Sequence, residues 1–429
     1  MLIAFSVENF RSFSAEQIFS FASSSDRSHE STHCMRTGMR AVPKVSKSAV
    51  IFGANASGKT NMLAALATFR DLILHSTGYS DDRLRELHTP FRFGPTEHQP
   101  TRFEIDVLLG TTRYRYSLSH DARRITAERL LVYRTGKSQR WFERRFDPDT
   151  QRDEWLGFSP HFNGPRKMWR KATRPTALFL TAAAQLNSDQ LAPLVHWVEH
   201  SLEIVLPADL NDLGRAAAYV QNEDFKERML ALLRAVDIPV EDVRVAEREI
   251  APGGFRASGS PAPPAQPPLV EFLYAHKGWV PVWLDSAFEA AGTQRLFALL
   301  GPLLTAIDRG RLLLIDEFDT GLHPLIARFL VQIINDPETS SHGAQLVLIT
   351  HNTTLMDLDI LRRDEIWLME LDANRASVLT PLLRSTPRKR ELIAKCYLLG
   401  LYGAVPSIRS EARVAAPRRD PEASRSRRS

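Results

Sequence analysis

Alternating hydrophobic and polar residues predict β-strands in the N-terminal part of the chain. Residues 1–8 alternate as a half-buried strand does. Three further runs, at 102–109, 113–118 and 128–133, have the same character, and a turn at 110–112 separates the first two. We therefore expect an antiparallel β subdomain in this region.

Other stretches predict buried parallel strands and helices. Residues 43–52, 311–317 and 345–351 each contain an apolar run typical of a parallel strand covered on both faces. Residues 60–75 and most of 176–238 have helical periodicity instead. Together these patterns predict an α/β fold with a mixed sheet, an antiparallel β subdomain and a helical lobe.

Composition divides the chain into five segments. Residues 251–268 are rich in Pro, Gly and Ala and predict a flexible linker, and residues 405–429 predict a disordered basic tail. The remaining segments are the two parts of one head, 1–160 and 269–404, and a helical lobe at 161–250. The first part of the head holds the antiparallel β subdomain.

Charge and cysteine content narrow the class of protein. The chain is 43% hydrophobic and 24% charged, as soluble globular proteins are. The net charge is +5, but the tail holds seven arginines and three acidic residues and so accounts for four of these charges. Two cysteines predict no disulfide framework. No apolar run approaches the ~20 residues of a membrane span, so we expect a cytoplasmic protein that does not contact membranes.

A complete phosphate-binding loop, G-x-x-x-x-G-K-[ST], lies between a predicted strand and a predicted helix at residues 53–60. Its glycines allow successive backbone N–H groups to face phosphate oxygens, and the helix N-terminus favours an anion. We expect Lys59 to contact the β- and γ-phosphates of ATP and Thr60 to bind Mg²⁺. The expected ATP-binding residues here are Gly53, Ala54, Asn55, Ala56, Ser57, Gly58, Lys59, Thr60 and Asn61.

Two other predicted strands end in residues that complete a nucleotide site. The first ends in Asp316 and Glu317, and the second ends in His351. Asp316 is the expected second Mg²⁺ ligand, and Glu317 is expected to polarise an attacking water. His351 is the expected γ-phosphate sensor. Phosphoryl transfer depends on such positioning more than on covalent chemistry.

These motifs, in this order, resemble the ABC-type ATPase superfamily. More narrowly, the chain is similar to stand-alone bacterial AAA-type ATP-binding proteins associated with restriction or abortive infection. Those proteins are related to the SMC and RecF heads and to the ATPase part of the overcoming-lysogenization-defect (OLD) nucleases. The narrower resemblance spans about residues 1–408 and rests on segments 5–13, 53–60, 178–185, 292–297, 315–324, 350–352 and 402–406.

The resemblance implies a homodimer whose two heads sandwich two ATP molecules. Each phosphate loop then faces the signature segment of the partner head, which Gly292 matches, while Asp319 matches the loop that crosses the interface. The chain departs from the family at Ala290, where a serine usually contacts the γ-phosphate across the dimer. Loss of that hydroxyl removes about 1.5–3 kcal/mol of hydrogen bonding to a charged phosphate. Turnover is therefore expected to be weak.

Three functions agree with the sequence. The first is an ATPase that acts as a dimeric switch in a bacterial anti-phage system and controls a separately encoded effector such as a nuclease. The second is a DNA repair or recombination ATPase like RecF or SMC. The third is an ATP-dependent scaffold that does not hydrolyse ATP, and the alanine at position 290 is the reason to consider it.

Two further sequence features concern DNA binding and a nuclease site. Four basic residues, Arg166, Lys167, Arg170 and Lys171, either line a DNA groove or form a solvated helix face. Asp357 and Asp359 have the spacing of a nuclease motif, but a helix expected over 353–361 directs their side chains to different sides. We expect no nuclease site and no metal site other than that for Mg²⁺.

Overall fold

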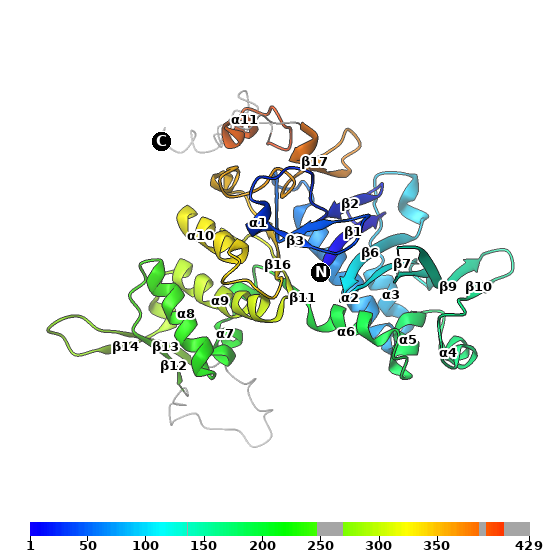
Figure 1. The fold of residues 1–429 in the computed structure, drawn as a ribbon, viewed down its shortest axis with the longest axis horizontal. Helices are drawn as coiled ribbons and strands as arrows, with labels where there is room; N and C mark the ends of the chain where they lie inside the picture. Colours follow the sequence, from blue (N-terminus) through cyan, green and yellow to red (C-terminus); the bar gives the residue numbers. More distant parts are fainter. Residues whose placement is uncertain (135, 247–268, 386–391, 407–429) are drawn as a thin grey trace, which may run out of the picture.

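The computed structural model describes residues 1–134, 136–246, 269–385 and 392–406 (Figure 1). The linker predicted at 251–268 lies outside these ranges, as does the predicted tail apart from Val405 and Pro406. None of the helices within the described ranges combines the length and apolarity that a membrane span requires.

A six-stranded sheet contains the apolar runs that predicted buried strands. Its strand order is β11-β15-β16-β5-β17-β18, and β18 alone runs antiparallel to its neighbour. The strands are β5 Ser48–Gly53, β11 Leu202–Val205, β15 Leu312–Ile315, β16 Gln345–Ile349, β17 Ile366–Leu371 and β18 Ser377–Pro381. Because β5, β16 and β15 are parallel neighbours, their carboxyl ends meet at one edge of the sheet.

A second sheet is antiparallel, with the order β10-β9-β8-β7-β6-β1-β2. Its strands are β1 Leu2–Glu8, β2 Gln17–Ser20, β6 Thr101–Leu109, β7 Thr112–His120, β8 Ile125–Tyr133, β9 Ser138–Asp147 and β10 Arg152–Phe158. Phe103, Tyr116 and Leu130 face a hydrophobic core, while intervening residues such as Arg102 and Glu104 lie on the opposite face. This sheet confirms the predicted antiparallel β subdomain.

Helices cover both faces of the six-stranded sheet. They are α2 Lys59–His75, α5 Phe179–Gln185, α6 Ala192–His200, α7 Leu213–Val220, α8 Glu223–Ala235, α9 Ala291–Arg309 and α10 Pro324–Asn335. On one face, Ile51 and Leu314 pack with α2, α5, α6 and the antiparallel sheet. On the other face, Val50 and Leu313 pack with α7 to α10. Neighbouring residues in a strand thus enter opposite cores, as burial on both faces requires.

The smaller elements lie around this framework. They are α1 Glu30–His33, β3 Cys34–Arg36, β4 Lys44–Ser46, α3 Asp81–Leu87, α4 Arg166–Ala172, β12 Asp242–Ala246, β13 Leu269–Tyr274, β14 Val282–Asp285 and α11 Ile393–Leu398. Strands β12 to β14 form a three-stranded sheet next to α7 and α8 at one end of the molecule (Figure 1). Strands β9 and β10 and helix α4 lie at the other end (Figure 1).

The predicted α/β class, with antiparallel and mixed sheets, is confirmed. Of two local predictions, the one for residues 161–250 was incomplete and the one for residues 353–361 was wrong. The segment predicted as a helical lobe, 161–250, also contains β11, which joins the six-stranded sheet. The helix predicted over 353–361 is only a 3-10 turn, Thr353–Leu355. There, side chains compete with helical hydrogen bonds: Asn352 Oδ1 accepts from the backbone N–H of Thr354, and Asp357 Oδ1 accepts from that of Asp359.

A buried histidine in the antiparallel sheet predicts acid sensitivity. His120 is fully buried, and no hydrogen-bond partner for its Nε2 is found among the described residues. Burial, with a smaller contribution from His88, lowers the pKa of His120 from its usual 6.5 to about 4. In the unfolded chain His120 binds a proton below about pH 6.5, whereas in the folded chain it binds one only near pH 4. Acid therefore lowers the free energy of unfolding, by about 3 kcal/mol at this residue.

Urea unfolding of wild type and of His120→Phe, from neutral pH to about pH 4, measures this contribution. The variant should lose about 3 kcal/mol less stability over this range. His276→Gln, at an exposed histidine, is the control and should follow wild type. Equal acid sensitivity in wild type and His120→Phe contradicts the assignment.

Candidate functional site

The phosphate loop connects the carboxyl end of β5 to the first turn of α2. Two of its positions exclude side chains. A Cβ on Gly53 would lie 2.3 Å from the backbone oxygen of Met369, and one on Gly58 would lie 2.1 Å from Ser377 Oγ. Gly58 also has a φ of +99°, which L-residues rarely adopt. The two glycines therefore allow the close approach of β17 and β18 to the loop.

The backbone of Lys59 forms the first residue of α2, and its side chain is buried. Its Nζ donates to the backbone oxygens of Gly53 and Ala54, at 2.9 Å each. Burial lowers the pKa of Lys59 to about 8, against the opposing effect of nearby Asp316, Glu317 and Asp319. The ammonium thus spans the inside of the loop, surrounded by the other charged groups of the site.

Asp316 and Glu317 follow β15 directly. Asp316 is 1% exposed, and burial raises the pKa of its carboxyl group. The nearby side chain of Thr60 has the opposite effect on that pKa. Glu317 is exposed, has a φ of +49°, and donates its backbone N–H to Asp316 Oδ1 at 3.0 Å. The two neighbouring carboxylates therefore occupy different environments, one buried against Thr60 and one open to solvent.

The oxygens of Thr60 and Asp316 fit Mg²⁺. This ion prefers oxygen ligands, and it is usually held by one or two protein groups together with substrate phosphates and waters. Burial destabilises the charged form of the Asp316 carboxylate, and a bound cation would stabilise that form. Within the described residues, no group of three or more His, Cys, Asp or Glu side chains that could hold a metal ion is found. The expected Mg²⁺ site needs no such group, because it consists of one hydroxyl and one carboxylate beside the phosphate loop.

His351 and Asp319 complete the cluster. His351 follows β16, which lies between β5 and β15. It is exposed, and burial of its ring, followed by the charge of Lys59, lowers its pKa. Both effects favour the neutral form of its imidazole. Thr350 Oγ1 donates to Asp319 Oδ1 at 2.5 Å, which fixes the loop after Glu317 against the end of β16.

The signature segment lies at the start of α9 and contacts the Asp319 loop. A Cβ on Gly292 would lie 2.4 Å from the backbone oxygen of Gly321, and Arg295 Nη1 donates to that of Thr320 at 2.7 Å. Ala290 is the N-cap residue of α9, and no side chain caps the helix there. The structure therefore brings Gly292 to the Asp319 loop, whereas the loop at 53–60 meets Asp316, Glu317 and His351.

Sequence reasoning assigned no role to Ser12, Ser377 and Arg11, which contact the phosphate loop or Asn61 just after it. Ser377 Oγ lies 2.7 Å from both Ser12 Oγ and the backbone oxygen of Ser57. Ser12 Oγ also accepts from Asn61 Nδ2 at 2.8 Å, and Arg11 Nη1 donates to Asn61 Oδ1 at 3.4 Å. The only signal in the sequence was the segment Asn9–Phe13 within the family resemblance. It did not indicate where this turn would pack.

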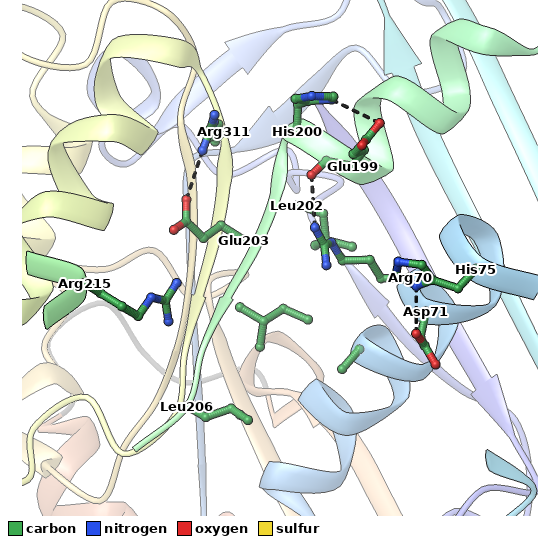
Figure 2. Close-up of a pocket in the computed structure, with 12 residues that line it drawn as sticks. Arg70, Asp71, His75, Glu199, His200, Leu202, Glu203, Leu206, Arg215 and Arg311 are labelled. Atoms are coloured by element: carbon green, nitrogen blue, oxygen red, sulfur yellow. Dashed lines mark hydrogen bonds and ion pairs between the residues drawn. The ribbon is translucent and has the colours of Figure 1, made fainter. Parts of the chain in front are cut away.

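A cavity of about 410 Å³ lies at the edge strand β11, apart from this cluster (Figure 2). Its charged residues are mostly paired with one another. Arg311 Nη1 lies 3.2 Å from Glu203 Oε2, and His75 Nδ1 lies 2.9 Å from Asp71 Oδ1. It contains none of the predicted site residues, so we do not place the nucleotide there.

The chain matches one family model and has solved structures similar to it. The model of a family described as "AAA domain, putative AbiEii toxin, Type IV TA system" matches residues 48–357. Among curated proteins, none matches the chain. The SMC head domain from Thermotoga maritima is 14% identical, with a TM-score of 0.40, over 89% of this chain and 98% of that one. An SMC head bound to the C-terminal winged-helix domain of ScpA is 13% identical, with a TM-score of 0.41, over 90% and 99%.

Proposed function

Because the chain belongs to this AAA-domain family, we propose that it binds and hydrolyses ATP and acts as a dimeric switch in the cytoplasm. One observation carries the proposal. The phosphate loop, the Asp316–Glu317 pair and His351 follow three neighbouring parallel strands, β5, β15 and β16, and so meet at one edge of the sheet. Ligands of open α/β sheets bind at such carboxyl ends.

Each residue of the cluster has a role in this proposal. Lys59 and the loop N–H groups bind the phosphates. Thr60 and Asp316 hold Mg²⁺, which when bound neutralises phosphate charge. Glu317, exposed and acceptor-only, orients a water molecule for attack. His351 donates a hydrogen bond from its ring to the γ-phosphate.

The second half of the site is supplied by another copy of the chain. Gly292 is the second residue of α9, where a backbone N–H has no acceptor within the helix, so this N–H could donate to an ATP molecule held by a partner head. Asp319 belongs to the same interface. Ala290, at the N-cap of α9, offers no hydroxyl to that ATP, so we expect slow turnover.

Ala290→Ser tests this assignment. A serine at the N-cap position accepts from an unpaired helix N–H and stabilises the protein by about 0.5–2 kcal/mol. It also restores a donor towards the γ-phosphate across the dimer, which should raise turnover by roughly 10-fold or more. Phosphate release and thermal unfolding measure both effects. Ala291→Ser, one residue inside the helix, is the matched control. Equal turnover in wild type and Ala290→Ser contradicts a trans-acting signature segment.

The biological role we propose is control of a separately encoded effector, such as a nuclease, during phage infection. The family description, which names an AbiEii toxin and a Type IV TA system, supports this context. Phage plating on cells with the native gene cluster, with the cluster deleted, or with Lys59→Ala provides the test. Equal plating of a broad phage panel on all three strains contradicts the role and leaves the ATPase assignment intact.

Ala290 specifically favours a second candidate, an ATP-dependent scaffold that does not hydrolyse ATP. If the chain is a scaffold, wild type and Glu317→Gln should release phosphate equally, with and without DNA. If it is an ATPase, wild type should release clearly more phosphate than Glu317→Gln.

A further inference from the structure

Helix α4 carries a basic surface without counter-charges. The surface consists of Arg166, Lys167, Arg170, Lys171 and Arg174. All are exposed except Arg166, which is partly buried. Over the described residues, no carboxylate lies within ion-pair distance of any of them. These nine residues extend two positions beyond α4 and carry five cations without a carboxylate partner in the described part of the chain, although Arg174 Nη2 donates to the backbone oxygen of Tyr79 at 3.5 Å.

Arginines of the adjoining antiparallel sheet behave differently. Arg113 Nη2 lies 2.5 Å from Asp106 Oδ2, Arg145 Nη2 lies 2.6 Å from Glu143 Oε1, and Arg124 Nη2 lies 2.7 Å from Asp153 Oδ1. Carboxylates thus neutralise these three arginines. Helix α4, at one end of the molecule, carries four cations without such a partner among the described residues (Figure 1).

Aromatic rings hold two of these arginines. The guanidinium carbon of Arg170 lies 5.4 Å from the ring centroid of Trp155, and that of Arg166 lies 5.8 Å from the ring centroid of Phe158. A ring orients a guanidinium without using its N–H donors, whereas a carboxylate partner would consume them. Arg170 therefore keeps its donors for an external anion, and Arg166 gives only one N–H, to the backbone oxygen of Ser159.

The helix itself is firmly anchored. Trp169 is 2% exposed, lies against Phe162 and donates Nε1 to the backbone oxygen of Leu186 at 3.3 Å. The cations thus project from a fixed support. The helix dipole accounts for basic residues in the last turn only, at about 0.3–1 kcal/mol each. Arg170 and Lys171 occupy that turn, so the dipole does not account for Lys167 or Arg174.

We propose that the basic surface of α4 binds the phosphate backbone of duplex nucleic acid without reading its sequence. Closely spaced, unpaired and pre-oriented cations match the regular charges of a phosphate backbone. The binding requires no ATP and no second copy of the chain. It is therefore independent of the proposed ATPase function.

The test uses the full chain, a short blunt-ended DNA duplex as probe and a series of NaCl concentrations without ATP. The logarithm of the binding constant should fall linearly with that of salt concentration. Because each lost phosphate contact removes about 0.9 from the slope, Lys167→Gln combined with Arg170→Gln should flatten it by about 2. Arg234→Gln combined with Arg309→Gln, at exposed sites on α8 and α9 that form no ion pair with a described residue, removes the same charge and should leave the slope unchanged.

Two outcomes would overturn the proposal. One is equal loss of affinity and slope in the α4 variant and the α8–α9 control, which reduces the effect to net charge. The other is equally tight binding of polyglutamate with the same α4 dependence, which makes an acidic protein the partner. Unchanged thermal unfolding and ATP binding of the α4 variant separate this result from failure of the fold or of the ATPase site.

Arg170→Lys tests the stacked guanidinium by itself. It keeps the charge but loses the planar contact with Trp155, so affinity should fall while the salt slope stays the same. Affinity equal to that of wild type contradicts the role given to the stacking.

Discussion

Replacing Lys59 with alanine should severely weaken ATP binding while the chain remains folded. Lys59 Nζ lies inside the phosphate loop, held by the backbone oxygens of Gly53 and Ala54. It is placed to transfer these hydrogen bonds to two phosphate groups. Each hydrogen bond to a charged group is worth about 1.5–3 kcal/mol, so two lost bonds weaken binding by roughly 10²–10⁴-fold. Calorimetric titration with Mg-ATP measures the loss.

Lys47 provides the matched control for Lys59→Ala. It is also a buried lysine, and burial lowers its pKa. It precedes the first residue of β5, at the opposite end of the strand from the phosphate loop. Lys47→Ala should therefore retain ATP affinity and may be compared with Lys59→Ala in thermal unfolding. Micromolar or tighter ATP binding by a folded Lys59→Ala variant contradicts the location of the site.

Glu317→Gln should reduce ATP turnover by about 10²–10⁴-fold and leave ATP binding intact. The amide keeps the size of the side chain but cannot accept a proton from water. Because Glu317 is exposed and Asp316 is buried against Thr60, the substitution spares the proposed Mg²⁺ ligands. Single-turnover phosphate release measures the effect. Glu338→Gln, an exposed acid beyond α10, should turn over ATP as wild type does. Turnover of Glu317→Gln at the wild-type rate assigns the water-orienting role to another group.

The parts of the site predictable from sequence are those encoded by contiguous residues. The phosphate loop is complete within residues 53–60. Asp316 and His351 could be placed beside it because each follows an apolar run, and parallel strands end at a common edge. Their convergence on neighbouring strands agrees with that reasoning.

Contacts between distant segments could not be predicted. Ser12 and Ser377 meet beneath the phosphate loop, although 365 positions separate them. No local pattern pairs them. Likewise, β11 is only four residues long and follows a helix, so its strand character comes from pairing with β15. A helix was expected over 353–361, after the strand that ends in His351, but the side chains of Asn352 and Asp357 accept hydrogen bonds from backbone N–H groups in a turn.

The most direct test of the central claim, that ATP is held between two copies of the chain, is the molar mass of Glu317→Gln by light scattering with and without Mg-ATP. Slow turnover should trap the sandwich, so we predict the mass of one chain without nucleotide and of two chains with it. Adding Ala290→Glu, which places a bulky anion at the exposed N-cap of α9 in the partner-facing segment, should prevent the doubling. A Glu317→Gln protein that binds ATP stoichiometrically and keeps the mass of a single chain contradicts the account.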